Sequence, residues 1–180
     1  MVIHRGTHGT CYEWARSICE NGFHPSASGH AGPGVYLWAY EEDPTTARTL
    51  AINWFQLADS KWKSYASVKE KGCTVIYAEF AAQPTDCLDC TTLSMEEALS
   101  RILAKSERME NEDLDAAYQT LVKRIEDKSN VTFKLIRARV SIPKGMPFQQ
   151  KKLLGSPLVH VIRQEFDKIT VTNCEQVAVA

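Results

Sequence analysis

The sequence predicts a single α+β domain, because segments with helical spacing and segments with strand-like patterning follow one another along the chain. Residues 12–21 and 44–59 carry apolar side chains at helical spacing, whereas residues 35–38 and 74–82 are apolar segments typical of strands. The chain has 180 residues, of which 44% are hydrophobic and 24% charged. This length and composition suit one domain with a sizeable core.

The N-terminal quarter predicts a cleft rather than a packed core. Residues 1–3 open as a short apolar strand, and His8 is followed by Gly9, whose missing Cβ lets bare backbone approach whatever lies opposite. The helix expected over residues 12–21 meets a glycine stop at Asn21-Gly22. Residues 24–34 contain almost nothing to bury, so we expect a surface loop between two packed elements.

The remaining chain predicts further elements and one insertion. Residues 61–72 form a polar connection, residues 130–140 alternate as a strand, and residues 143–145 turn. Residues 93–128 predict a helical insertion of one or two helices, split near residues 110–113. The tryptophans are candidates for the core, and Trp38 is the one expected at the cleft floor; the set is Trp14, Trp38, Trp54 and Trp62.

Composition and cysteine usage narrow the functional classes. No apolar run approaches membrane-spanning length, and the N-terminal residues lack a signal-peptide pattern, so we expect a cytoplasmic protein without a membrane partner. The six cysteines are then expected to be mostly reduced. Cys87 and Cys90 have the spacing of half a zinc site, but no second pair follows, and a strand-to-helix turn explains them better; we expect no metal. The formal net charge of −1 predicts no strong attraction to nucleic acid.

One succession of motifs resembles a known family. His8-Gly9-Thr10, a helix, Asn21-Gly22-Phe23, a polar glycine loop and Gly32-Pro33-Gly34-Val35-Tyr36-Leu37 are similar to the NAD-binding half of the ADP-ribosyltransferase superfamily, in its poly(ADP-ribose)-polymerase-like branch. The resemblance implies a split antiparallel β-sheet core with flanking helices. It also implies a His-Tyr-Glu triad, NAD as co-substrate, and no further cofactor.

The resemblance assigns a role to each matching residue. His8 would hold the adenosine ribose, the Gly9 backbone would clamp the nicotinamide amide, Thr10 would assist at the ribose, and Tyr36 would stack on the nicotinamide ring. Arg5 would lie near the NAD phosphates. The family's second stacking ring is missing from its usual context, and Tyr40 or Trp54 is a candidate replacement. His24 and His30 lie in the glycine loop and are either ligand contacts or solvated side chains.

The triad carboxylate has two candidate positions near a late strand over residues 164–173. Glu165 is the carboxylate that suits the family pattern, but an ungapped alignment backwards from Ile169 places Lys168 at that position. Three interpretations follow: a shifted glutamate at Glu165, a natural inactive member, or a chain altered to silence a toxic activity. A second register, with Arg5-Gly6 as in the other large branch of the superfamily, lacks that branch's later motifs.

The chemistry of NAD cleavage explains why these residue types are needed. Breaking the nicotinamide glycosidic bond builds positive charge on the ribose, which a nearby carboxylate stabilises. An aromatic face favours the flat, cationic nicotinamide ring, and a histidine that donates hydrogen bonds to ribose oxygens fixes the orientation of the ribose.

The resulting hypothesis is a mono-ADP-ribosyltransferase that modifies a macromolecular acceptor, either protein or RNA/DNA. Its compact form resembles a toxin of a toxin–antitoxin or phage-defence system, with an antitoxin as partner, and the loop over residues 149–157 would face the acceptor. The alternatives are a silent NAD-binding or partner-binding module and an RNA 2′-phosphotransferase. The latter would need basic residues around the cleft, and only Arg5, Arg16 and Arg48 are near it in sequence.

Overall fold

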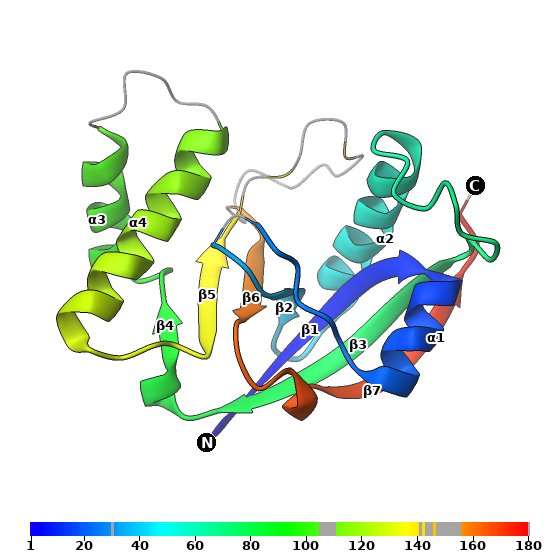
Figure 1. Ribbon diagram of the computed structural model, residues 1–180, viewed down its shortest axis with the longest axis horizontal. Helices are drawn as coiled ribbons and strands as arrows, with labels where there is room; N and C mark the ends of the chain where they lie inside the picture. Colours follow the sequence, from blue (N-terminus) through cyan, green and yellow to red (C-terminus); the bar gives the residue numbers. More distant parts are fainter. Residues whose placement is uncertain (30, 105–110, 141, 143–145, 147–155, 180) are drawn as a thin grey trace.

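A seven-stranded mixed sheet forms the centre of the α+β fold in the computed structural model (Figure 1). The structure describes residues 1–29, 31–104, 111–140, 142, 146 and 156–179. The sheet order is β4 (Cys87–Asp89), β5 (Leu135–Arg139), β6 (Leu158–Ile162), β2 (Val35–Tyr40), β1 (Val2–Cys11), β3 (Cys73–Ala82) and β7 (Thr170–Val177). Neighbouring strands are antiparallel except for the parallel pair β4–β5.

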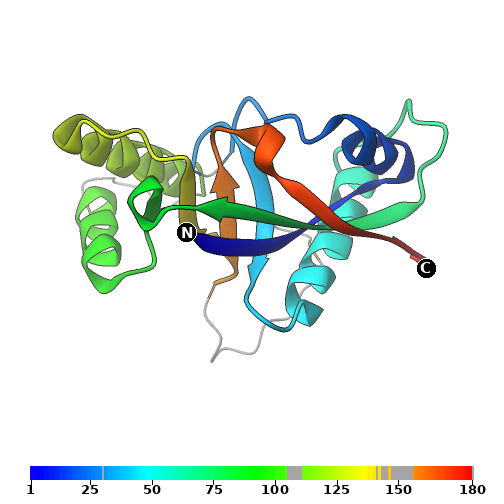
Figure 2. The same cartoon turned by 90° about the horizontal axis from the view of Figure 1, so that it is seen from below.

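Helices cover both faces of this sheet. Helix α2 (Thr45–Ser60) crosses one face and α1 (Tyr12–Asn21) lies on the opposite face, as the two views together show (Figures 1 and 2). Helices α3 (Leu93–Leu103) and α4 (Asn111–Ser129) pair with each other at the β4–β5 end. Figure 2 also shows that β2 and β6 run crosswise to β1, β3 and β7, so the sheet is strongly twisted.

The sheet splits between its two central strands. Strand β1 pairs with β3 along its whole length, from Val2 to Cys11, but its register with β2 covers only Arg5 to Thr7. Past Thr7, the β2 side of β1 therefore has no strand beside it in the part of the chain that the structure describes. Backbone groups on an unpaired strand edge need other partners, such as a ligand or water.

Most predicted elements are confirmed, with shifted boundaries. Helices α1 and α2, strands β2 and β3, and a helical insertion, which consists of α3 and α4, lie where the patterns indicate. Strand β1 is much longer than residues 1–3, because pairing with β3 extends it through the polar residues up to Cys11. The late strand starts only at Thr170, after a short 3-10 helix, η3 (Phe166–Lys168). The predicted turn at 143–145 lies outside the described residues, as does the predicted acceptor loop except for its last two positions.

The tryptophan prediction holds only in part. Trp38 is buried, but Trp14 and Trp62 are each 46% exposed, so the prediction that they are core residues was wrong. Each meets a neighbouring ring in a T-shaped arrangement, Trp14 with Tyr65 and Trp62 with Trp54, with ring centroids 5.0 Å and 5.2 Å apart. Among the described residues, no helix combines the length and apolar content that crossing a lipid bilayer requires.

Candidate functional site

A cavity of about 610 Å³ opens where β1 and β2 separate. Its volume lies in the range of small-molecule sites, which are mostly apolar with a few polar groups. The walls come from the end of β1, α1, the glycine loop, β2, α2 and α4, with single residues from other segments. The lining residues are His8, Gly9, Thr10, Trp14, Ser17, Ile18, Phe23, His24, Pro25, Ser26, Ser28, Gly29, Gly34, Val35, Tyr36, Leu37, Trp38, Trp54, Asp115, Val140 and Val159.

His8 lies at the point where the sheet splits and is bonded across the gap. Its Nδ1 is 3.2 Å from the carbonyl oxygen of Tyr36. Because a carbonyl oxygen can only accept, Nδ1 carries the proton and donates the hydrogen bond. Burial lowers the pKa of His8, although the bond to the Tyr36 carbonyl raises it in part. A neutral ring that carries its proton on Nδ1 leaves Nε2 as a hydrogen-bond acceptor. His8 is therefore suited to accept a hydrogen bond from a ribose hydroxyl, whereas the sequence interpretation had it donating.

Tyr36 lines the cavity with its hydroxyl fixed to the glycine loop. The hydroxyl oxygen accepts a hydrogen bond from the Ala31 amide at 3.0 Å and donates one to the Gly32 carbonyl at 2.6 Å. A Cβ on Gly29 would lie 2.4 Å from the same oxygen, so the loop packs directly on the end of this ring. Burial raises the pKa of Tyr36 to about 12. Tyr36 therefore stays protonated and offers an aromatic surface rather than a base.

Gly9 and Thr10 are both in the cavity wall, but each also has a packing role. A Cβ on Gly9 would lie 1.8 Å from the backbone oxygen of Ala51, so the missing side chain lets α2 approach β1 closely. Thr10 is buried, and its side chain hydrogen-bonds the Tyr65 phenol. The bare backbone predicted at Gly9 thus faces a helix on one side and borders the cavity.

Further aromatic rings line this cavity, namely Trp14, Phe23, Trp38 and Trp54. Of the two candidates for a second ring, Trp54 lines this cavity together with Tyr36, whereas Tyr40 lines the smaller cavity described below. Phe23 meets His8 edge-on, with ring centroids 5.6 Å apart. Phe23 belongs to the quoted Asn-Gly-Phe motif but carried no predicted role. His24 lines the cavity, while His30 lies outside the described residues.

Glu165 does not lie with His8 and Tyr36. It precedes η3 in a left-handed backbone conformation, and its Oε1 is 3.0 Å from Lys168 Nζ and 3.1 Å from Lys134 Nζ. The hydrogen bonds from Lys168 and Lys134 hold the pKa of the Glu165 carboxyl below its usual range. Neither Glu165 nor Lys168 is among the described residues that line the cavity.

The carboxylate that does line the cavity is Asp115, on α4 of the insertion. Its charge contributes to the raised pKa of Tyr36, which is due first to burial. One turn further along α4, the Gln119 side-chain amide donates a hydrogen bond to the Gly29 carbonyl at 3.3 Å. Asp115 and Gln119 are four residues apart and so share one helix face. Sequence patterns gave no signal for this site residue, because the helix reaches the cavity only through the tertiary fold.

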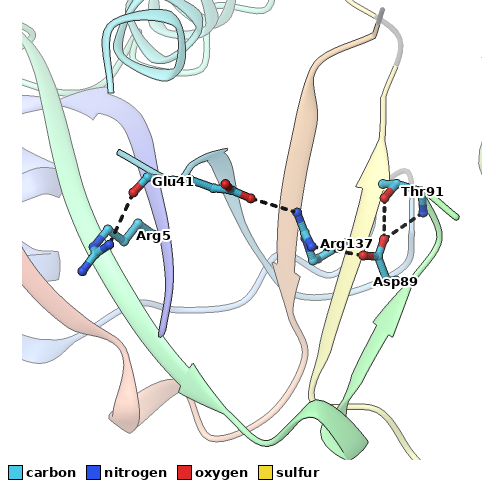
Figure 3. A network of polar contacts seen from close by, with 5 residues as sticks. All are labelled: Arg5, Glu41, Asp89, Thr91 and Arg137. Atoms are coloured by element: carbon cyan, nitrogen blue, oxygen red, sulfur yellow. Dashed lines mark hydrogen bonds and ion pairs between the residues drawn. The ribbon is translucent and has the colours of Figure 1, made fainter. Parts of the chain in front are cut away.

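Arg5 lies at a second, smaller cavity of about 190 Å³. Its Nε donates to Glu79 Oε1 at 2.8 Å, and its Nη1 donates to the Glu41 carbonyl at 3.3 Å. The Glu41 carboxylate reaches toward Arg137, which donates to Asp89 at 3.0 Å, as Figure 3 shows. Arg5 is therefore not among the described residues that line the larger cavity with His8 and Tyr36.

Two histidines mark the smaller cavity, the buried His160 and the half-buried His4. His160 is 4% exposed and meets His4 edge-on with ring centroids 5.1 Å apart. Burial is the first cause that lowers the pKa of His160 to about 3. His160 is thus a neutral core residue.

The Cys87–Cys90 segment is part of a strand and the turn that follows it. Asp89 Oδ1 accepts hydrogen bonds from the amide and hydroxyl of Thr91, at 2.9 Å and 2.6 Å, just before α3 begins at Leu93. This is the predicted strand-to-helix turn. In the described ranges, no group of three or more histidine, cysteine, aspartate or glutamate side chains is arranged to hold a metal ion.

Comparison with family models, with curated proteins and with solved structures finds no match to this chain.

Proposed function

We propose that the larger cavity binds NAD and that the protein is an NAD-dependent ADP-ribosyltransferase. The observation that carries the proposal is the meeting of His8 and Tyr36 at the split of the sheet, beside a cavity with aromatic walls. Trp54 and Tyr36 supply the flat surfaces that a cationic nicotinamide ring favours. The motif resemblance gives these same two residues the roles of ribose and nicotinamide contacts.

The transfer is a substitution at the anomeric carbon of the nicotinamide ribose. The bond from C1′ to the nicotinamide nitrogen breaks, and its electron pair leaves with nicotinamide. A nucleophile on the acceptor forms the new bond to C1′ and releases its proton. Positive charge builds on the ribose between these events, and the Asp115 carboxylate is the anion at the cavity that would stabilise it.

A silent NAD-binding or partner-binding module is the second candidate, favoured by the position of Glu165. The motif resemblance assigns the Glu165 carboxylate to catalysis. This carboxylate instead forms ion pairs with Lys134 and Lys168, and it is not part of the described cavity lining. An RNA 2′-phosphotransferase has less support, because the described cavity lining contains no lysine or arginine. Arg5, Arg16 and Arg48 each form an ion pair with a glutamate instead.

The decisive measurement is NAD binding by calorimetry beside nicotinamide release by the purified chain. We expect binding and release in the wild type, and at least about tenfold weaker binding in Tyr36→Ala, because the stacking surface is lost. His8→Ala should weaken binding too, whereas His4→Ala, a histidine on the same strand outside this cavity, is the matched control. No binding of NAD at millimolar concentration would overturn the proposal.

Two carboxylate variants and one lysine variant separate the transferase from the silent module. Asp115→Asn should lower nicotinamide release about 100-fold or more with little change in NAD binding, because it removes the anion but keeps the shape. Glu165→Ala should leave turnover unchanged. Binding without release in the wild type, with release gained only in Lys168→Glu, would instead establish the silenced-enzyme interpretation.

The acceptor and the partner belong to the same proposal. A macromolecular acceptor, protein or RNA/DNA, and an antitoxin protein are the expected partners. NAD labelled in its ADP-ribose part, incubated with the protein and a cell extract, distinguishes the acceptors. A label on a protein acceptor is lost on protease treatment and survives nuclease, whereas a label on RNA or DNA is lost on nuclease treatment and survives protease.

A further inference from the structure

Two exposed cysteines from opposite ends of the chain meet on the surface of the protein. The Sγ atoms of Cys19 and Cys174 are 2.6 Å apart, although the residues are separated by 155 positions. Cys19 lies in the last turn of α1, and Cys174 lies in β7, the edge strand of the sheet. Both side chains are exposed, so a small oxidant in solution has access to them.

The other cysteines do not share this arrangement. Cys11, Cys73 and Cys90 are buried, and Cys87 is half-buried. Cys11 and Cys73 face each other across β1 and β3, but both are inside the core and out of reach of an oxidant. Exposure and close contact together therefore single out one pair.

We propose that Cys19 and Cys174 form a reversible disulfide that clasps α1 to β7 under oxidising conditions. Disulfides in proteins of reducing compartments are usually transient and redox-sensing, and such a sensor needs an accessible thiol beside a resolving thiol. The pair has this arrangement. The proposal does not rest on the NAD-binding function, because it concerns thiols outside the cavity.

The oxidation proceeds by thiol–disulfide exchange with a small disulfide such as oxidised glutathione. The Cys19 thiolate attacks one sulfur, the small disulfide breaks, and one glutathione thiolate leaves. The Cys174 thiolate then attacks the Cys19 sulfur and releases the second glutathione. The two protein thiols lose two electrons and two protons, and the small disulfide gains both as two thiols.

The clasp would act on the wall of the larger cavity. Helix α1 ends at Asn21 and contributes Trp14, Ser17 and Ile18 to that wall. A covalent bond from its last turn to β7 would fix the helix on the sheet. It would also restrict the unfolded chain, because the bond closes a very long loop.

The test compares the full chain equilibrated with oxidised glutathione and with a reducing agent. We expect the thiols that react rapidly in the native protein to disappear on oxidation, and a Cys19–Cys174 linked peptide in a non-reducing digest. The melting temperature of the oxidised form should rise by about 5–10 °C. Cys19→Ser and Cys174→Ser should each abolish the linked peptide and the rise, whereas Cys87→Ser is the matched control and should keep both.

Two results would overturn the clasp. One is stable glutathionylation of Cys19 without the linked peptide. The other is a linked peptide that appears only in covalent dimers, which would mean that the thiols join two chains. None of these readouts depends on NAD, so a failure here leaves the proposed activity untouched, and the reverse also holds.

Discussion

His8, Tyr36 and Gly9 show how single residues at the split of the sheet combine packing with a site. His8 donates a hydrogen bond from Nδ1 to the Tyr36 carbonyl, which sets the tautomer and leaves Nε2 as an acceptor. The Tyr36 hydroxyl is committed to the glycine loop, so only its ring is left for a ligand. Gly9 lets α2 approach, and this contact holds the end of β1 in place.

Gly9→Ala should be strongly destabilising. The added Cβ would lie 1.8 Å from the Ala51 backbone oxygen, and neither β1 nor α2 can move without disturbing the core. We expect the free energy of unfolding to fall by about 3 kcal/mol or more in urea denaturation. Gly72→Ala is the matched control, because a Cβ there meets nothing within 4 Å. A Gly9→Ala protein as stable as the control would contradict the close approach.

At the scale of elements, α2 is tied to the edge strand β7 by one charged cluster. Arg48 of α2 donates to both carboxylate oxygens of Glu175, at 2.9 Å and 2.6 Å, and the Tyr77 hydroxyl donates to the same carboxylate at 2.8 Å. The Arg48 bonds, followed by the Tyr77 bond, lower the pKa of Glu175 to about 2. A bidentate pair with a third donor fixes geometry better than a simple surface pair.

Glu175→Gln should therefore cost about 1 kcal/mol of unfolding free energy, a value kept small because both side chains are 35% exposed. The stabilisation exists above the ordinary glutamate pKa and should vanish as the pH falls toward 2, since the folded-state pKa is the lower one. Glu70→Gln is the control, because its contact with Arg16 is 3.7 Å long and more exposed. Equal effects of the two variants in urea denaturation at neutral pH would refute the special role of the cluster.

The helical insertion contributes directly to the larger cavity. Helix α4 brings Asp115 to the cavity and holds the glycine loop through Gln119. The loop in turn is fixed to the Tyr36 hydroxyl. Insertion, loop and strand β2 thus form one connected wall.

For the whole molecule, one buried and two half-buried histidines set the response to acid. Burial is the first cause that lowers the pKa values of His4, His8 and His160, the last to about 3. The unfolded chain binds protons at these histidines as the pH falls below about 6.5, and the folded protein binds them only at lower pH. Acid therefore favours the unfolded state.

The free energy of unfolding should fall as the pH drops from about 6.5 toward 3. His160 alone should contribute a slope of about 1.4 kcal/mol per pH unit, because its folded-state pKa is the lower one. Urea denaturation of His160→Gln between pH 6 and pH 4 should show a slope that is shallower by about this amount. His24→Gln, in the exposed loop, is the control and should keep the wild-type slope. Parallel slopes for His160→Gln and the wild type would disprove the assignment.

Local patterns in the sequence determined much of the secondary structure. Helix α1 follows from its apolar spacing and the glycine after Asn21, and α2, β2 and β3 follow from equally local signals. The family resemblance of the N-terminal motifs also predicted that His8 and Tyr36 share a site, and both line the larger cavity. The length of β1 was not readable, since pairing with β3 rather than its own composition extends it to Cys11.

Only the tertiary structure decided what surrounds that motif. Glu165 is close to Lys134 and Lys168 because the chain turns at η3, and Asp115 enters the cavity because α4 folds back over the glycine loop. Cys19 and Cys174 meet for a similar reason, across the whole length of the chain. Short-range spacing fixes helices and strands, but a site assembled from distant segments depends on sheet order and packing, which no local pattern encodes.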